Sequence, residues 1–155
     1  MQADDYFAIQ NLLFSYPFTL DRGDFDGVGE IFKHANFYIA GKLICSQDPA
    51  AVARNFRDWV LVDSAGSPRT RHCIANVVIE PDGEDRAIVK SYVMVFQQTD
   101  KLPLQAVIGG DYRDTVQKVG GRWRFVERHI GNDLVGNLVA HGRDPGVVKP
   151  TKANP

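Results

Sequence analysis

The run RAIVKSYVMVFQQ at 86–98, followed by PLQAVIGGDYRDTVQKV at 103–119, decides the fold of this chain. Both runs are rich in β-branched and aromatic residues, and only a short polar turn separates them, so they predict neighbouring antiparallel strands. HCIANVVIE at 72–80 and RWRFVERHI at 122–130 extend the pattern on either side, across turns rich in glycine, proline and aspartate. The sequence therefore predicts a four-stranded antiparallel meander.

Three segments ahead of these strands have helical periodicity, at 4–18, 21–32 and 48–62. Pro17 should end or kink the first of them, because proline has no N–H and disfavours helical geometry in the residue before it. Between the second and third, FYIAGKLIC at 37–45 predicts a hairpin or a strand interrupted by a glycine bend. Helices followed by a run of strands are typical of an α+β domain in which the helices cover one face of a curved sheet.

The glycine pair Gly109-Gly110 lies inside one of the long strands, where glycine permits bulges and sharp bends. We therefore expect a cone-shaped α+β barrel that encloses a cavity. The chain has 155 residues, the size of one ordinary domain. We place that domain at 1–140, and expect the aperiodic tail at 141–155 to form an extended C-terminal arm.

Composition excludes several classes of function. The formal net charge is −1, from 18 basic and 19 acidic residues, so no positive field favours nucleic acid or an anionic membrane surface. No apolar run is long enough to cross a bilayer and the first residues do not resemble a signal peptide, so we expect a cytoplasmic protein. The usual phosphate-loop, dinucleotide, zincin and serine-hydrolase motifs are missing, and the histidines and cysteines lack metal-ligand spacing. The sequence predicts neither a metal nor a cofactor.

The strand at 72–80 has one mixed face and one apolar face, and the apolar face should meet the helices. The mixed face consists of His72, Ile74, Asn76 and Val78, and the apolar face of Cys73, Ala75, Val77 and Ile79. A mixed face that lined a cavity would present a titratable nitrogen and an amide to it. However, a lone histidine in such a strand is more often structural, and Asp21, at the end of the first helix, is on spacing alone more often a cap. The residues by themselves leave both roles open.

Four segments, taken together and in this order, resemble the SnoaL-like branch of the nuclear transport factor 2-like superfamily. They are TLDRGDFDGVGEIF (19–32), RTRHCIANVVIE (69–80), GGDYRDTV (109–116) and GGRWRFVERHI (120–130). The resemblance implies three N-terminal helices against a strongly curved mixed sheet, with a mostly apolar pocket inside the cone. It also implies a homodimer or homotrimer.

The resemblance further implies a catalytic pair. In members such as scytalone dehydratase and hexachlorocyclohexane dehydrochlorinase, an aspartate at the end of the first helix orients a histidine on the strand after the third helix. That histidine removes a proton from a small cyclic substrate, and the two positions match Asp21 and His72 here. The implied activity is that of a cofactor-independent lyase or isomerase acting on a small, largely apolar cyclic or aromatic compound. Further candidates for binding the substrate are aromatic, amide and sulfur side chains: Tyr16, Tyr38, Trp59, Asn76, Met94 and Tyr112.

Two differences between this sequence and those family members keep other functions open. The strand that reads YVMVFQQ has no histidine where scytalone dehydratase uses a second one. The basic residues Arg71, Arg113 and Arg128 have no assigned role at a leaving group. The alternatives are a non-catalytic module that binds a small ligand, and a small assembly subunit like that of ring-hydroxylating dioxygenases.

Overall fold

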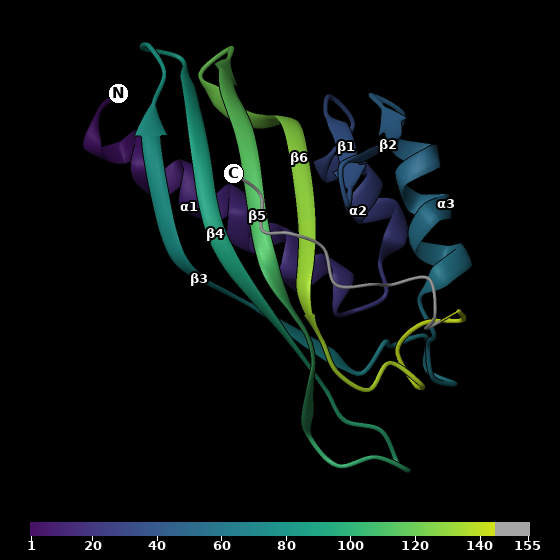
Figure 1. The fold of residues 1–155 in the computed structure, drawn as a ribbon. Helices are drawn as coiled ribbons and strands as arrows, with labels where there is room; N and C mark the ends of the chain where they lie inside the picture. The colour runs from purple at the N-terminus through teal and green to yellow at the C-terminus, as the bar shows by residue number, and fades with distance from the viewer. Residues whose placement is uncertain (145–155) are drawn as a thin grey trace.

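The computed structural model describes residues 1–144, which form three helices packed on one face of a six-stranded sheet (Figure 1). The helices are α1 (Ala3–Leu20), α2 (Phe25–Ile31) and α3 (Pro49–Trp59). The strands are β1 (Asn36–Ile39), β2 (Lys42–Ser46), β3 (Thr70–Pro81), β4 (Arg86–Gln97), β5 (Gln105–Val119) and β6 (Arg122–Val135). The predicted α+β architecture is confirmed.

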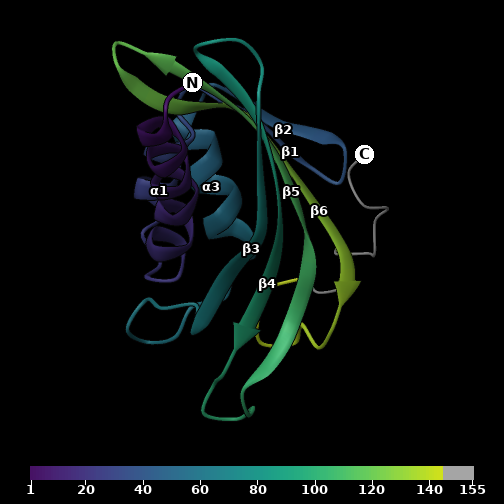
Figure 2. The same cartoon turned by 90° about the vertical axis from the view of Figure 1, so that its left-hand side faces the viewer.

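The strands lie in the order β2-β1-β6-β5-β4-β3. Strands β3 to β6 form the predicted antiparallel meander. The β1–β2 hairpin adds to the other edge through a parallel pairing of β1 with β6, in which Asn36 lies opposite Glu127. Figure 2 shows the sheet bending around the helices, so that the concave face encloses the space between them.

Capping residues define the two shorter helices. Asp24 accepts a hydrogen bond from the Gly27 N–H at 2.8 Å at the start of α2, and Asp48 accepts one from the Ala51 N–H at 2.9 Å at the start of α3. Such caps satisfy N–H groups that have no partner within the helix. Apolar residues of both helices then face the sheet and form the core with α1.

The sequence predicts that the first helix ends or kinks at Pro17; it does not end there, because α1 continues through the proline to Leu20. Leu13, Tyr16 and Leu20, on both sides of the proline, are buried in the core. This burial outweighs the one helical hydrogen bond that proline cannot donate. As a result the helix ends with Asp21 as its C-cap.

The predicted facing of β3 is also wrong, because a bulge interrupts the strand between Ala75 and Val78. An extra residue in one strand reverses which side chains point inward. Ile74, before the bulge, packs against the core on the same side as His72, whereas after the bulge the inward residues are Val77 and Ile79. The predicted apolar face is therefore split between the two sides of the sheet.

The chain does not leave the domain after β6 but packs back against it. The Gly136 N–H donates to the Val107 carbonyl, and Gly142 forms an antiparallel bridge with Val60. His141, the first residue of the predicted arm, is buried at 4% exposure. The rest of that arm beyond Asp144 lies outside the described residues. Within residues 1–144 we find no helix with the length and apolar character needed to span a membrane.

Candidate functional site

Asp21 and His72 come from different elements that meet at the end of α1. Asp21 caps the helix, and its own N–H donates to the Pro17 carbonyl at 2.9 Å. Gly23 follows with φ 76°, and a side chain there would collide with the Gly66 carbonyl, so only glycine permits this close turn. His72 is the third residue of β3. The structure thus brings the two predicted residues together.

The Asp21 carboxylate holds His72 by its ring and by its backbone. Asp21 Oδ1 lies 2.6 Å from His72 Nδ1, and Asp21 Oδ2 accepts the His72 backbone N–H at 2.9 Å. The Thr70 hydroxyl donates to Oδ1 at 2.7 Å. Both side chains are nearly buried, at 8% exposure for His72 and 9% for Asp21. The imidazole is therefore fixed in position and in orientation.

Burial acts to raise the pKa of Asp21, but the hydrogen bonds from His72 and Thr70 and the charge of the imidazole outweigh it and hold that pKa below 3.8. The carboxylate is ionised at neutral pH and can only accept hydrogen bonds, so His72 Nδ1 carries the ring proton. In a neutral imidazole with this tautomer, Nε2 has a free lone pair, which is the arrangement of a general base.

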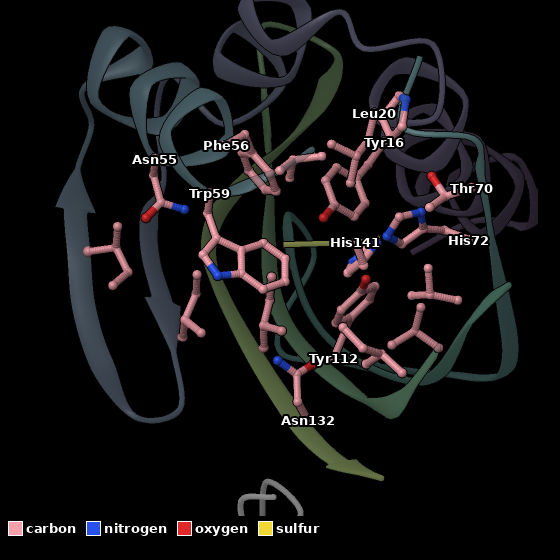
Figure 3. Close-up of a pocket in the computed structure, with 18 of the residues that line it drawn as sticks. Tyr16, Leu20, Asn55, Phe56, Trp59, Thr70, His72, Tyr112, Asn132 and His141 are labelled. Atoms are coloured by element: carbon pink, nitrogen blue, oxygen red, sulfur yellow. The ribbon is translucent and has the colours of Figure 1, made fainter. Parts of the chain in front are cut away.

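His72 lines a cavity of about 520 Å³ between the helices and the concave face of the sheet, whereas its partner in the dyad, Asp21, does not (Figure 3). Its walls are mainly apolar, and a smaller set of polar side chains lies among them. The apolar walls include Leu20, Ile39, Ile44, Phe56, Val60, Val93, Val95, Ile108 and Ile130, and the polar side chains include Tyr16, Asn55, Thr70, His72, Tyr112, Asn132 and His141. A space of this size and character suits a small, largely apolar ligand.

Of the six residues predicted to bind substrate, Tyr16, Trp59 and Tyr112 line this cavity and three do not. Asn76 is exposed with φ 52° at the β3 bulge, which turns it away from His72. Tyr38 stacks on His129, which is its partner in the parallel pairing of β1 with β6, and the ring centroids are 4.2 Å apart. Met94 is half-buried on β4, between Val93 and Val95, which line the cavity from the other face of the strand.

Tyr16 and Tyr112 form a hydroxyl pair at the cavity wall, with ring centroids 6.0 Å apart. Burial raises the pKa of Tyr16 to about 12, and burial next to Tyr16 raises the pKa of Tyr112 well above its usual value of 10. Both groups are thus neutral at physiological pH and can donate or accept hydrogen bonds. Figure 3 shows both tyrosines among the side chains that surround the cavity.

A buried ion pair lies behind the tyrosines. Arg128 binds Asp114 through two hydrogen bonds, of 2.6 and 2.7 Å, and both side chains are fully buried. The guanidinium carbon lies 4.3 Å from the ring centroid of Tyr112 and 4.8 Å from that of Tyr16. Arg128 therefore supports the tyrosine pair from the core side and does not itself line the cavity.

Sequence reasoning missed this ion pair and also missed His141. Asp114 and Arg128 are direct partners in the β5–β6 register, so the hairpin pattern carried a signal for the pair. His141 had no comparable signal, because its place depends on the path that the chain takes after β6. Within residues 1–144 no group of three or more histidine, cysteine, aspartate or glutamate side chains is arranged to hold a metal ion.

The sequence matches the family model of the SnoaL-like domain over residues 1–129. No curated protein matches it. Several solved structures are similar, three of which show the range. A protein of unknown function from Mycobacterium tuberculosis, Rv3472(D26N), is 27% identical with a TM-score of 0.67, over 93% of this chain and 77% of that one. A protein of unknown function with a cystatin-like fold from Nostoc punctiforme is 22% identical with a TM-score of 0.73, over 90% of this chain and 98% of that one.

A third structure, described as a putative scytalone dehydratase from Novosphingobium aromaticivorans, is 23% identical with a TM-score of 0.67, over 85% of this chain and 86% of that one. At this identity the last two likenesses show the fold alone. The family match covers most of the sequence and includes both Asp21 and His72. The chain belongs to the SnoaL-like domain family.

Proposed function

We propose that the protein is a cofactor-independent lyase or isomerase in which His72 removes a proton from carbon in a small cyclic or aromatic substrate. One observation carries the proposal: the His72 ring, held by Asp21 at 2.6 Å, borders an apolar cavity of about 520 Å³. An imidazole fixed in this way is a general base with one lone pair available to a bound molecule. A purely structural histidine would need no such cavity beside it.

The chemical step follows from the geometry. His72 Nε2 takes a proton from a carbon atom next to an electron-withdrawing group, and the electrons of the broken C–H bond form a new C=C bond. Asp21 stabilises the imidazolium that results, because its carboxylate accepts the hydrogen bond from Nδ1. The proton then returns to a different carbon in an isomerisation, or leaves with a β-hydroxyl as water in an elimination.

Hydrogen–deuterium exchange tests the step before the natural substrate is known. 2-Tetralone is a small fused-ring ketone with acidic C–H groups, and NMR in D₂O follows the loss of its α-hydrogens. We expect the protein to accelerate this exchange, and His72→Ala to lower the acceleration by about 10²- to 10⁴-fold. The control is His129→Ala, since His129 stacks on Tyr38 and does not line the cavity. Exchange that is equally fast in the His72→Ala variant would refute the proposal.

The main alternative is a non-catalytic module that holds an apolar metabolite in the same cavity. The apolar walls favour it as much as they favour an enzyme, whereas the ordered dyad favours the enzyme. The two differ in the exchange experiment, because a binding module would take up 2-tetralone without exchanging its hydrogens. The homo-oligomeric state, the cytoplasmic location and a role as an assembly subunit stay predictions.

A further inference from the structure

His141 is a second imidazole at the same cavity, and the proposed base does not account for it. It lines the cavity together with His72, although the two residues are far apart in sequence (Figure 3). Its side chain packs edge-on against Trp59, with ring centroids 5.2 Å apart. His141 is 96% buried, since its exposed fraction is 4%. Such a residue is placed by the fold and is not a surface group that happens to point inward.

Backbone contacts on both sides fix this histidine. The Leu61 N–H donates to the His141 carbonyl at 3.1 Å, and the Arg143 N–H donates to the Trp59 carbonyl at 2.8 Å. A side chain at position 142 would collide with the Trp59 indole, so Gly142 lets the segment lie flat against that ring. The segment is therefore held closely enough to position an imidazole.

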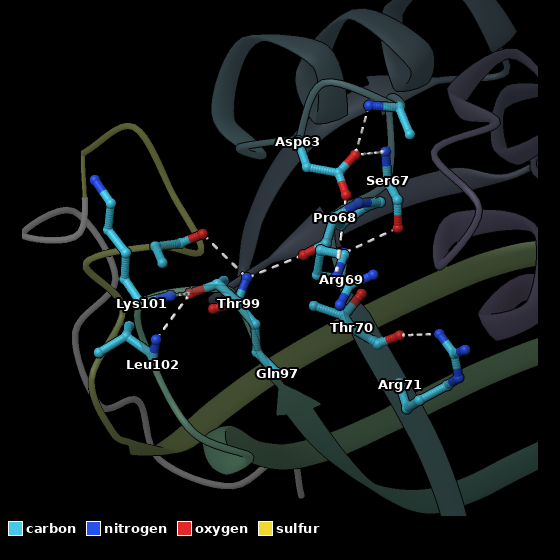
Figure 4. A network of polar contacts seen from close by, with 12 residues as sticks. Asp63, Ser67, Pro68, Arg69, Thr70, Arg71, Gln97, Thr99, Lys101 and Leu102 are labelled. Atoms are coloured by element: carbon cyan, nitrogen blue, oxygen red, sulfur yellow. Dashed lines mark hydrogen bonds and ion pairs between the residues drawn. The ribbon is translucent and has the colours of Figure 1, made fainter.

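Gln97 joins this segment to the start of β3. Its amide donates to the Ala140 carbonyl and to the Pro68 carbonyl, both at 3.0 Å (Figure 4). Pro68 lies two residues before Thr70, which binds Asp21. The same amide thus ties the segment that carries His141 to the segment that carries the dyad.

The His141 side chain is polar, neutral and only partly satisfied. Its Nδ1 is buried and has no hydrogen-bond partner among the described residues. Burial, together with the nearby charge of His72, lowers the pKa of His141 to about 4, against a smaller opposing effect of Asp21. At neutral pH the ring is uncharged, with one N–H donor and one acceptor nitrogen. Buried polar groups in proteins nearly always have partners. Because Nδ1 itself is enclosed, the nitrogen of this cavity-lining ring that can meet a ligand is Nε2.

We propose that His141 is a second catalytic residue, which donates a ring N–H to an oxygen atom of the substrate while His72 acts on the neighbouring carbon. The inference rests on the proposed function and deepens it by naming the substrate class: small cyclic or aromatic compounds with a carbonyl group next to the reacting C–H. Other polar side chains also line this cavity, among them Lys42, Asn55 and Asn132, but of the cavity-lining residues His141 alone has a buried side-chain nitrogen or oxygen without a partner among the described residues.

Atoms and electrons balance in this step. When His72 removes the α-proton, the C–H electron pair forms a C=C bond and the carbonyl π electrons move to oxygen. The resulting enolate oxygen accepts the hydrogen bond from His141, and the Tyr16–Tyr112 hydroxyls lie at the same wall of the cavity. A neutral imidazole suits this role, since it stabilises the oxygen without carrying a charge that would repel the imidazolium at His72.

The test compares two probes that differ only in the oxygen function, 2-tetralone and its hydrocarbon counterpart tetralin. Dissociation constants are measured for the wild-type protein and for His141→Phe and His141→Gln. We expect His141→Phe to weaken the binding of 2-tetralone about tenfold more than the binding of tetralin, because the carbonyl group then enters the cavity without its hydrogen-bond donor. His141→Gln keeps an amide donor and should recover most of that loss.

His129→Phe is the matched control, since it changes an imidazole that does not line the cavity. Equal effects of His141→Phe on both probes, or no effect on either, would overturn the role of His141. This test is separate from the test of the proposed function, which depends on hydrogen exchange catalysed by His72. If His72→Ala abolished exchange and His141→Phe left binding unchanged, His72 would remain the base and only the contact from His141 would be refuted.

Discussion

Asp21 is the residue on which the geometry of the site depends, because three hydrogen-bond donors converge on its carboxylate. Two of them belong to His72, its ring and its backbone N–H. The aspartate therefore fixes both the direction of the imidazole and the point at which β3 begins. No other residue type of similar size accepts three such donors with a negative charge.

Asp21→Asn should remove the base while keeping the shape of the site. The asparagine amide has one acceptor oxygen, so its NH₂ group must face one of the former donors. We expect the amide to donate to His72 Nδ1 and so to move the ring proton to Nε2, which lowers α-hydrogen exchange of 2-tetralone on the order of 10²-fold or more. NMR of the ring nitrogens would report the tautomer. Unchanged exchange with the proton still on Nδ1 would contradict this account.

His141 should make stability depend on pH. Its folded pKa of about 4 lies below the ordinary value of 6.5, so the unfolded chain binds a proton that the folded chain does not. Its contribution is present above pH 6.5 and is lost as the pH falls through 4, up to about 3 kcal/mol. Denaturant unfolding between pH 7 and pH 4 measures the free energy of unfolding over this range.

His141→Phe should flatten that part of the profile, and His129→Phe should leave it unchanged. The lowered pKa of Asp21 adds a loss of stability in the same direction, but below pH 3.8, so the two effects separate along the pH axis. An identical slope in His141→Phe and the wild type would show that His141 is not buried as a neutral ring.

At the scale of elements, the glycines of β5 predicted a bend, and the register supports it. The pairing of β5 with β6 shifts between Gly109 and Asp111, and a side chain at position 110 would collide with the Gly131 carbonyl. The two backbones approach more closely here than side chains allow. The bulge that the sequence predicted at the glycine pair is therefore present.

Gly110→Ala should destabilise the fold by at least about 2 kcal/mol, because the added methyl group meets backbone that cannot rotate away. Gly120→Ala is the matched variant: Gly120 has φ 58°, but a methyl group there meets nothing within 4 Å. Alanine at that position should lower the free energy of unfolding by only about 1 kcal/mol, the cost of its left-handed backbone conformation. Thermal or denaturant unfolding compares the two, and equal losses would show that the close approach at Gly110 is unimportant.

Element types were largely readable from local patterns, whereas details that depend on tertiary contacts were not. Caps at Asp24 and Asp48 and the alternation of β4 act within a few residues, so the sequence displays them. The continuation of α1 through Pro17 depends on burial against other elements. The bulge in β3 likewise changed which side chains of the strand point inward, and no glycine or proline at the bulge indicated it in the sequence.

Across the whole molecule, the core is built around a charge. Arg128 lies among four aromatic rings, with guanidinium-to-centroid distances from 4.3 to 5.0 Å, and Asp114 neutralises it. Two of those rings, Tyr16 and Tyr112, also line the cavity. The ion pair therefore connects the packing of the core to the shape of the site.

Asp114→Asn should cost about 3–5 kcal/mol, because it leaves a buried guanidinium without a counter-charge. The double variant Asp114→Leu/Arg128→Met should recover most of that loss, since neither charge is then buried. Unfolding free energies measure both. A single variant as stable as the wild type would show that the pair is not sealed from water.

The parts of the site differed in how far sequence could locate them. Asp21 and His72 were found through the family resemblance, since their spacing alone favoured ordinary roles. Tyr16, Trp59 and Tyr112 were proposed from their residue types and line the cavity, whereas Tyr38, Asn76 and Met94, proposed in the same way, do not. His141 was not found, since the return of the chain after β6 is set by distant contacts at Val60, Gln97 and Val107.

The parallel pairing of β1 with β6 has a consequence for how the protein folds. Each of the other strand pairs described here joins two strands that are consecutive in the chain. The β1–β6 pairing instead brings together Asn36 and Glu127, which are far apart in sequence. Contacts so distant in sequence carry a large loop-closure cost and form late. Ile39 and Ile44 of the hairpin border the cavity, so we expect this part of its wall to form late in folding.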